Sequence, residues 1–219
     1  MKKKIFEKYS IILLVFLTGS FIGFLHENLL EVLQGYYRLK QGLIYEPLIP
    51  VYGFGALLFY FIYKDLNMEK KSCLARTFIV FAIAFVMGAG IEYFLSFAQE
   101  KIFGTISWNY TNLKFNLNGR TSLFHGCFWG LTGILFYRLL LPFIKKVECY
   151  LQGKPHRLAI IILSTILFLD CTISTVACLR HTRRREGILP QNYIERFLDE
   201  HYPDDYLKRI YPTARVPKR

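Results

Sequence analysis

The chain has 219 residues, of which 53% are hydrophobic and 17% aromatic, and its mean hydropathy is positive. This composition excludes an ordinary soluble domain. The formal net charge of +12 would suggest nucleic-acid binding in a soluble protein. Here Lys and Arg flank apolar runs, so anionic lipid headgroups account for them and no nucleic-acid partner is expected. The five Cys form no CxxC pair. They are therefore interpreted as small buried side chains, and no metal or other cofactor is expected.

Five apolar runs predict an all-α, polytopic bundle of about five transmembrane helices in the cell membrane. The first run follows a basic N-terminus and is too long for a signal peptide, so we expect a retained helix. The second is brief and opens with a proline and small residues, which suit a helix start and close helix packing. Its packing residues are Pro50, Tyr52, Gly53 and Gly55. The expected spans are residues 10–33, 48–63, 77–97, 121–143 and 158–179.

The remaining residues, 181–219, form a basic and amphipathic tail, so the transmembrane domain is expected to cover residues 1–180. The tail pattern predicts a short helix, a break at Pro203 and a second short helix or turn. We expect a peripheral module that lies on lipid headgroups or on the helix ends.

Lys and Arg are enriched before the first run, between the second and third runs, and between the fourth and fifth runs. By the positive-inside rule, this distribution favours a cytoplasmic N-terminus. Five spans would then place the basic tail outside. Three alternatives remain open: the second run does not fully cross, the orientation is reversed, or the tail is external.

The connector between the third and fourth runs reads WNYTNLKFNLNGR over residues 108–120. It brings aromatic anchors, amides and a guanidinium to one membrane face, which favours an interfacial loop that packs back onto the helices. The residues of this loop singled out for a role are Trp108, Tyr110, Asn116, Asn118 and Gly119.

Ionisable residues occur inside or at the ends of the apolar runs near that same face. They are Glu27, Glu31, Glu92, Arg120 and His125. Charged groups at membrane depth face one another or a wet cavity, so we expect these side chains to form an intramembrane polar cluster. Within it, Arg120 is expected to pair with Glu92 or Glu27. Asp170 lies near the middle of the fifth run and is expected to bind a backbone group or a hydroxyl.

Several motifs are similar to the signatures of a known family. The pattern PxYGxGAL occurs at residues 50–57, FNLNGR at residues 115–120, and the tail carries HYPD at residues 201–204. Together they resemble the bacterial multi-pass family labelled putative ABC-transporter permease, over nearly the whole chain. The resemblance implies a permease subunit that works with a separate ATPase subunit. A second copy of the chain, in a homo-oligomer, is another candidate partner.

The sequence contains no GxxxxGK[ST] phosphate loop, so the chain is not itself the ATPase. One alternative function is a membrane-embedded enzyme that processes lipid or envelope material. In it, His125 would act as base with Glu27 or Glu92, and Arg120 would bind an anionic headgroup. Another alternative is a structural or assembly factor in the membrane. No HExxH motif or Ser-His-Asp order is recognised, so no catalytic residue is assigned and a non-enzymatic function is favoured.

Overall fold

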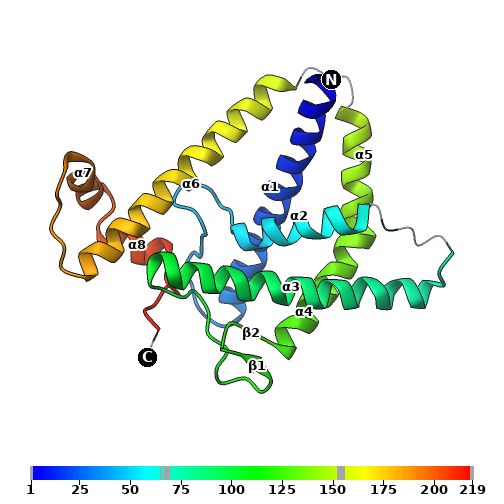
Figure 1. Cartoon of the computed structure of the whole chain (residues 1–219), viewed down its shortest axis with the longest axis horizontal. Coiled ribbons are helices and arrows are strands. Elements are labelled where there is room, and N and C mark those ends of the chain that lie inside the picture. The colour runs from blue at the N-terminus through cyan, green and yellow to red at the C-terminus, as the bar shows by residue number, and fades with distance from the viewer. Residues whose placement is uncertain (1, 65, 67–69, 152–155, 218–219) are drawn as a thin grey trace.

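The computed structural model describes all residues except 1, 65, 67–69, 152–155 and 218–219, and it is mostly helical. Figure 1 shows the arrangement of the elements, with the N-terminus and the C-terminus far apart. The helices are α1 (Lys2–Leu33), α2 (Pro50–Lys64), α3 (Cys73–Phe103), α4 (Leu123–Leu135), α5 (Leu141–Leu151), α6 (Arg157–Arg185), α7 (Tyr193–His201) and α8 (Asp204–Ile210), with a π-helical turn η1 (Phe136–Leu140) between α4 and α5. A hairpin of β1 (Asn116–Leu117) and β2 (Thr121–Ser122) precedes α4.

Within the described residues, four helices are long and apolar enough to cross a membrane. They are Ile5–Leu33, Cys73–Phe103, Leu123–Tyr150 and Arg157–Arg185. The third of these combines α4, η1 and α5. Helix α2 has only 15 residues. At a rise of about 1.5 Å per residue it is about 22 Å long, less than the bilayer core of about 30 Å. The membrane helix bundle is therefore present, whereas the expected count of five spans is not confirmed.

The π-helical turn in the third of these helices has a local cause. Pro142 is the second residue after the turn, following Leu141. Proline has no backbone N–H, and in a regular α-helix its ring clashes with the carbonyl four residues earlier, here that of Arg138. Widening the helix by one residue just before Pro142 accommodates the ring while the chain continues in the same direction.

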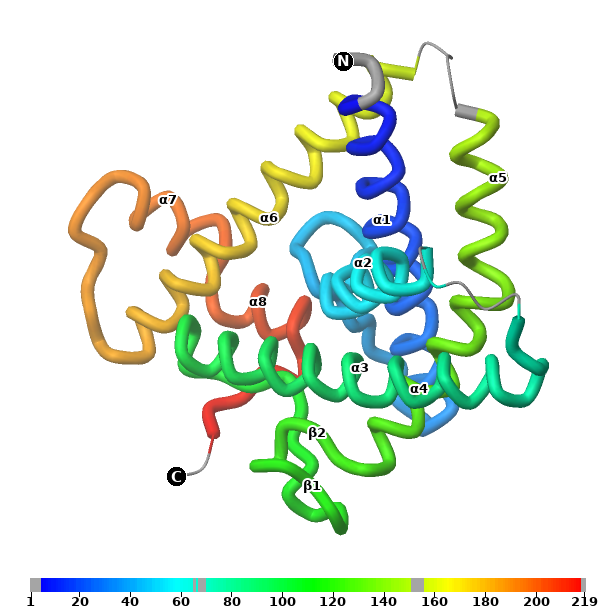
Figure 2. Tube along the Cα trace, turned by 45° about the vertical axis from the view of Figure 1, so that its right-hand side comes forward, coloured from blue at the N-terminus to red at the C-terminus, as the bar shows by residue number. Residues whose placement is uncertain are grey.

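Although it is short, α2 lies at the centre of the molecule and contacts α1, α3, η1 and α5. Figure 2 shows it nearly end-on among these neighbours. Its buried Phe59 and Tyr63 belong to one core with Val15 of α1, Ala84 of α3 and Trp129 of α4. The Tyr63 hydroxyl donates a hydrogen bond to the Val80 carbonyl at 2.8 Å, so its polar end is satisfied within the core.

Close packing between α3 and α4 depends on Gly88, and this contact can be tested. A Cβ at Gly88 would lie 2.5 Å from the Cβ and Cγ of Trp129. We expect Gly88→Ala to lower the unfolding free energy of the purified protein by about 1–3 kcal/mol, because overpacking forces neighbouring atoms apart. Gly90→Ala on the same helix is the matched control, since its Cβ would meet nothing within 4 Å. Thermal unfolding of both variants checks the expectation, and equal behaviour of the two would contradict it.

The two loops that follow α1 and α3 meet the tail on one face of the molecule. The backbone N–H of Gln41 donates to the Ile210 carbonyl at 3.4 Å. Ile106 and Arg215 form an antiparallel bridge with backbone hydrogen bonds of 2.8 and 2.9 Å. The hydroxyls of Tyr45 and Tyr202 lie 2.6 Å apart. Because α1 ends at this face, its N-terminal end lies on the opposite side of the molecule from the tail.

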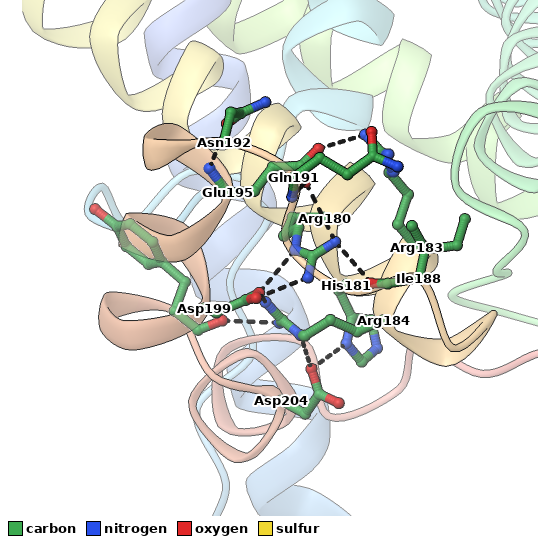
Figure 3. Close-up of polar contacts among 11 residues, drawn as sticks. Arg180, His181, Arg183, Arg184, Ile188, Gln191, Asn192, Glu195, Asp199 and Asp204 are labelled. Atoms are coloured by element: carbon green, nitrogen blue, oxygen red, sulfur yellow. Dashed lines mark hydrogen bonds and ion pairs between the residues drawn. The ribbon is translucent and has the colours of Figure 1, made fainter.

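The tail forms α7 and α8 with the expected break at Pro203, and it packs on the helix ends. Figure 3 shows the charged contacts that hold it. Arg180 donates to both Asp199 oxygens at 2.8 and 2.7 Å. Arg184 reaches Asp199 and Asp204 at 2.6 and 2.7 Å. These guanidiniums are bound to carboxylates inside the protein and are not free to bind headgroups. The boundary between the transmembrane domain and the tail at residue 180 remains a prediction.

Candidate functional site

The FNLNGR stretch forms the hairpin between α3 and α4. Asn118 and Gly119 both have positive φ, as the central residues of a type I′ turn require. The amide oxygen of Asn116 accepts from the Gly119 N–H at 2.9 Å, which closes the turn. The indole N–H of Trp108 donates to the Arg120 carbonyl at 2.9 Å, and so attaches the start of the loop to its end. The loop therefore has a defined structure that places Tyr110 against the helices.

Glu92, Tyr110 and His125 come together beneath this loop. The Tyr110 hydroxyl donates to Glu92 Oε1 at 3.1 Å, and the Tyr110 ring stacks on His125 with centroids 3.6 Å apart. Burial raises the pKa of the Tyr110 phenol well above its usual range, and the negative charges of Glu92 and Glu27 raise it further. The phenol is therefore a permanent hydrogen-bond donor at this site. Ser122 Oγ lies 2.8 Å from His125 Nδ1 and also caps α4.

Glu27 lies in a second group of contacts between α1 and α2. The Tyr52 hydroxyl donates to Glu27 Oε1 at 2.6 Å and lies 3.2 Å from His26 Nδ1. The Lys40 ammonium donates to Glu27 Oε2 at 2.6 Å. A Cβ at Gly23 would lie 2.3 Å from the Tyr52 ring, so this glycine allows the ring to lie directly on α1. The Glu27 charge is thus compensated by Lys40 rather than by Arg120.

Arg120 corrects the expected pairing with Glu92 or Glu27. Its guanidinium forms an ion pair with Glu100, one of the last residues of α3. It also lies over the rings of Phe97 and Tyr93, at 5.4 and 5.8 Å from their centroids. Glu31 binds Arg38 at 2.5 Å and lies 3.6 Å from Lys40 Nζ, so it is linked to Glu27 only through Lys40. The five predicted residues are therefore not one cluster. Glu27, Glu92 and His125 line one cavity, whereas Glu31 and Arg120 pair outside it.

The other predicted residues have packing and loop positions. A Cβ at Gly53 would lie 2.2 Å from Ser20 Oγ, and one at Gly55 would lie 3.0 Å from the Trp129 ring. Pro50 begins α2 and lines the cavity. Asn118 donates to the Tyr93 hydroxyl at 2.9 Å and stays outside the cavity.

Asp170 binds backbone groups and a hydroxyl, as expected. Its Oδ1 accepts from the Ile44 N–H at 3.2 Å and from the Ser174 hydroxyl at 2.9 Å. Its Oδ2 accepts from the N–H groups of Tyr45 and Glu46 at 3.0 and 2.9 Å. One buried carboxylate therefore holds the loop after α1 against α6.

The Glu46 carboxyl beside Asp170 gives this contact a pH dependence. Burial and the neighbouring Asp170 carboxylate raise the pKa of Glu46 from 4.5 to about 8. A carboxyl with a raised pKa binds its proton more tightly in the folded state, so its contribution to stability falls as pH rises from 4.5 toward 8. We expect the melting temperature of the wild type to drop between pH 5 and pH 9 more than that of Glu46→Gln. Parallel pH profiles for the two proteins would contradict this expectation.

A cavity of about 920 Å³ connects these groups. Its lining comes from the first four helices, the loops after α1 and α3, α6 and the tail. One set of lining residues comprises His26, Glu27, Tyr52, Glu92, Tyr110, His125 and Trp129. Another set, near the tail, comprises Ser174, Cys178, Arg185, Lys208 and Tyr211. Ligand sites commonly combine this size with apolar walls and a few polar groups.

Sequence reasoning missed three residues of this region. Lys40 and Glu100 compensate the charges of Glu27 and Arg120, and His26 lines the cavity. For Glu100 a signal was present. The α3 residues that contact Arg120, at 93, 96, 97 and 100, follow the spacing of a single helix face.

Comparison with protein families gives a match for residues 14–175, to the family described as Putative ABC-transporter type IV. The chain belongs to this family. The match extends from α1 into α6, so it confirms the resemblance over the helical part and stops before the tail. Comparisons with curated proteins and with solved structures give no match.

Membership of the Putative ABC-transporter type IV family agrees with four helices that are long and apolar enough to span a membrane. Both findings support a membrane protein with a transport context. The matched range contains Glu27, Tyr52, Glu92, Tyr110, His125 and Trp129, and thus the first set of cavity-lining residues.

Proposed function

We propose that the chain is the membrane-spanning permease subunit of an ATP-driven transporter and that the cavity is its substrate site. The observation that carries this proposal is the cavity of about 920 Å³ between helices long enough to span a membrane. Buried ionisable residues within spanning helices face the cavity, and such residues commonly mark substrate or ion pathways.

The energy for transport would come from a separate ATPase, because the sequence has no phosphate loop. We place the contact with this partner at the end of the molecule where α1 and α6 begin and α5 ends (Figure 1). This end carries basic residues, including Lys8 in α1 and Arg157 at the start of α6. The positive-inside rule favours a cytoplasmic location for this end.

The site geometry supports an enzyme less well. Arg120 is paired with Glu100 and does not line the cavity, so it is not placed to bind a headgroup there. The Ser122 hydroxyl accepts the His125 N–H at 3.3 Å as the cap of α4, and Ser122 is 4% exposed. Its position beside His125 is thus explained by helix capping.

Purification of the tagged full chain from its native membranes tests the proposal. We expect an ATPase with a phosphate loop to co-purify in a fixed ratio, and ATP hydrolysis to be found in the complex but not in the chain alone. An unrelated multi-pass protein with the same tag is the control. Absence of such an ATPase, together with an altered lipid composition in a deletion strain, would overturn the proposal in favour of a lipid-processing enzyme.

A further inference from the structure

Glu92 has an unsatisfied oxygen within the cavity lining. The residue is 6% exposed, and Tyr110 binds only its Oε1. Its Oε2 is buried and accepts no hydrogen bond of normal geometry among the described residues, although the Thr121 hydroxyl and the Trp129 indole lie close to the carboxylate. A carboxylate oxygen in a low-dielectric environment requires a hydrogen-bond donor or a cation. The cavity that Glu92 lines is where such a group would enter.

Aromatic rings from three elements line the same cavity. Tyr52 of α2 and Trp129 of α4 lie with ring centroids 5.6 Å apart. The stacked pair of Tyr110 and His125 adds two further rings. Since the Tyr110 hydroxyl donates to Glu92, these rings lie beside the unsatisfied carboxylate. The faces of aromatic rings attract cations, and Trp is the strongest of them.

The charges nearby leave Glu92 without compensation. The Lys40 ammonium is 2.6 Å from Glu27 Oε2, so those two charges balance each other. Arg185 and Lys208 also line the cavity, near the tail, but among the described residues neither forms an ion pair with Glu92. A ligand with one positive charge would therefore complete the charge balance at Glu92.

We propose that this part of the cavity binds an organic cation, a quaternary ammonium or a protonated amine that carries an apolar chain. Glu92 is its counter-ion, and the rings of Tyr52, Tyr110 and Trp129 surround the charged group. This inference rests on the proposed function of the cavity as a substrate site and names the class of substrate. Leu95 and Phe128 also line the cavity and provide apolar surface for the chain. An inorganic cation fits less well, because rings cannot replace its hydration shell as oxygen ligands do.

Three amphiphiles with the same six-carbon chain test the proposal: hexyltrimethylammonium, neutral hexyl β-glucoside and anionic hexyl sulfate. The full chain is purified in a neutral maltoside detergent, and binding is followed by the fluorescence of Trp108 and Trp129, both of which line the cavity. We expect the cation to bind at least about tenfold more tightly than the other two, which corresponds to about 1.4 kcal/mol.

Glu92→Gln should abolish this tenfold preference, whereas Glu200→Gln, the same change at an exposed position of α7, should preserve it. If Glu92→Gln fails to fold, Tyr110→Leu provides a second measurement, because Tyr110 lies in a loop rather than in a helix. It should weaken binding of the cation severalfold and leave binding of the glucoside unchanged.

Equal binding of the three amphiphiles, stronger binding of the sulfate, or a preference that survives in Glu92→Gln would overturn the proposal. Its failure can be distinguished from failure of the proposed function. An ATPase that co-purifies with a protein lacking cation preference would reject only the substrate class. Cation preference without an ATPase would retain the binding site and reject the permease role.

Discussion

Asp170→Ala should release the loop after α1 from α6 and lower the unfolding free energy by at least about 4 kcal/mol. The substitution leaves three backbone N–H groups, those of Ile44, Tyr45 and Glu46, without their acceptor. Hydrogen bonds to a charged group contribute about 1.5–3 kcal/mol each, and an unsatisfied buried donor adds a desolvation penalty. Asp170 is 3% exposed, so water cannot readily replace it.

Thermal unfolding of the purified protein measures the loss, and hydrogen exchange of the amides at 44–46 locates it. Asp205→Ala is the matched control, because Asp205 is an exposed carboxylate of α8. A change in Asp170→Ala no larger than in Asp205→Ala would show that the loop is held by other contacts. The Tyr45 and Tyr202 hydroxyl contact is the first alternative, since it links the same loop to the tail.

Asp199→Ala should detach the tail from the end of α6 and cost about 3–5 kcal/mol, the usual range for breaking a buried ion pair from one side. The Arg180 side chain is 2% exposed and would lose both of its short contacts with Asp199. Glu195, at 3.7 Å, would remain as an ion-pair partner, and Asp204 as a more distant negative charge. Arg184 would lose one of its two carboxylate partners at the same time.

Protease sensitivity of residues 186–192, between α6 and α7, reports detachment directly, and thermal unfolding reports the free energy. Arg196→Ala is the control, because Arg196 is exposed on α7. The hydrogen bonds that Arg180 and Arg184 donate hold the pKa of Asp199 at about 2, compared with 3.8. Since a depressed carboxyl pKa stabilises the fold above the unfolded value, the wild-type tail should stay docked at pH 4 and loosen as pH falls toward 2. A tail that is equally resistant to protease in Asp199→Ala would show that these ion pairs do not hold it.

These contacts bear on the orientation of the chain. A cytoplasmic N-terminus and five spans would place the basic tail outside. Arg180, Arg183 and Arg184 are bound to Asp199, Glu195 and Asp204, as Figure 3 shows. The positive-inside rule counts Lys and Arg and gives Asp and Glu little weight, so these ion pairs do not by themselves remove the conflict between this rule and an external tail.

Features that depend on residues close together along the chain could be predicted from the sequence. The apolar runs predicted the helices because length and composition decide whether a segment can satisfy its backbone within a membrane. The aromatic and amide residues of 108–120 predicted an interfacial loop, whereas the turn at Asn118-Gly119 was not predicted. The proline at 203 predicted the break between α7 and α8 because it cannot continue a helix. The depth of Glu27 and Glu92 followed from counting along each helix.

Only the tertiary structure decided which side chains meet. Depth placed Glu27, Glu92 and Arg120 in one layer, but pairing also depends on how each helix is rotated about its axis. Tyr93, Phe97 and Glu100 share the face of α3 that Arg120 contacts, whereas Glu92 faces the cavity. A difference of one residue turns a helical side chain by about 100°, and no pattern along the chain specifies where a distant partner stands. The cavity could not be predicted from the sequence for the same reason. Its walls come from helices, loops and a tail that are separated along the chain and meet only after packing.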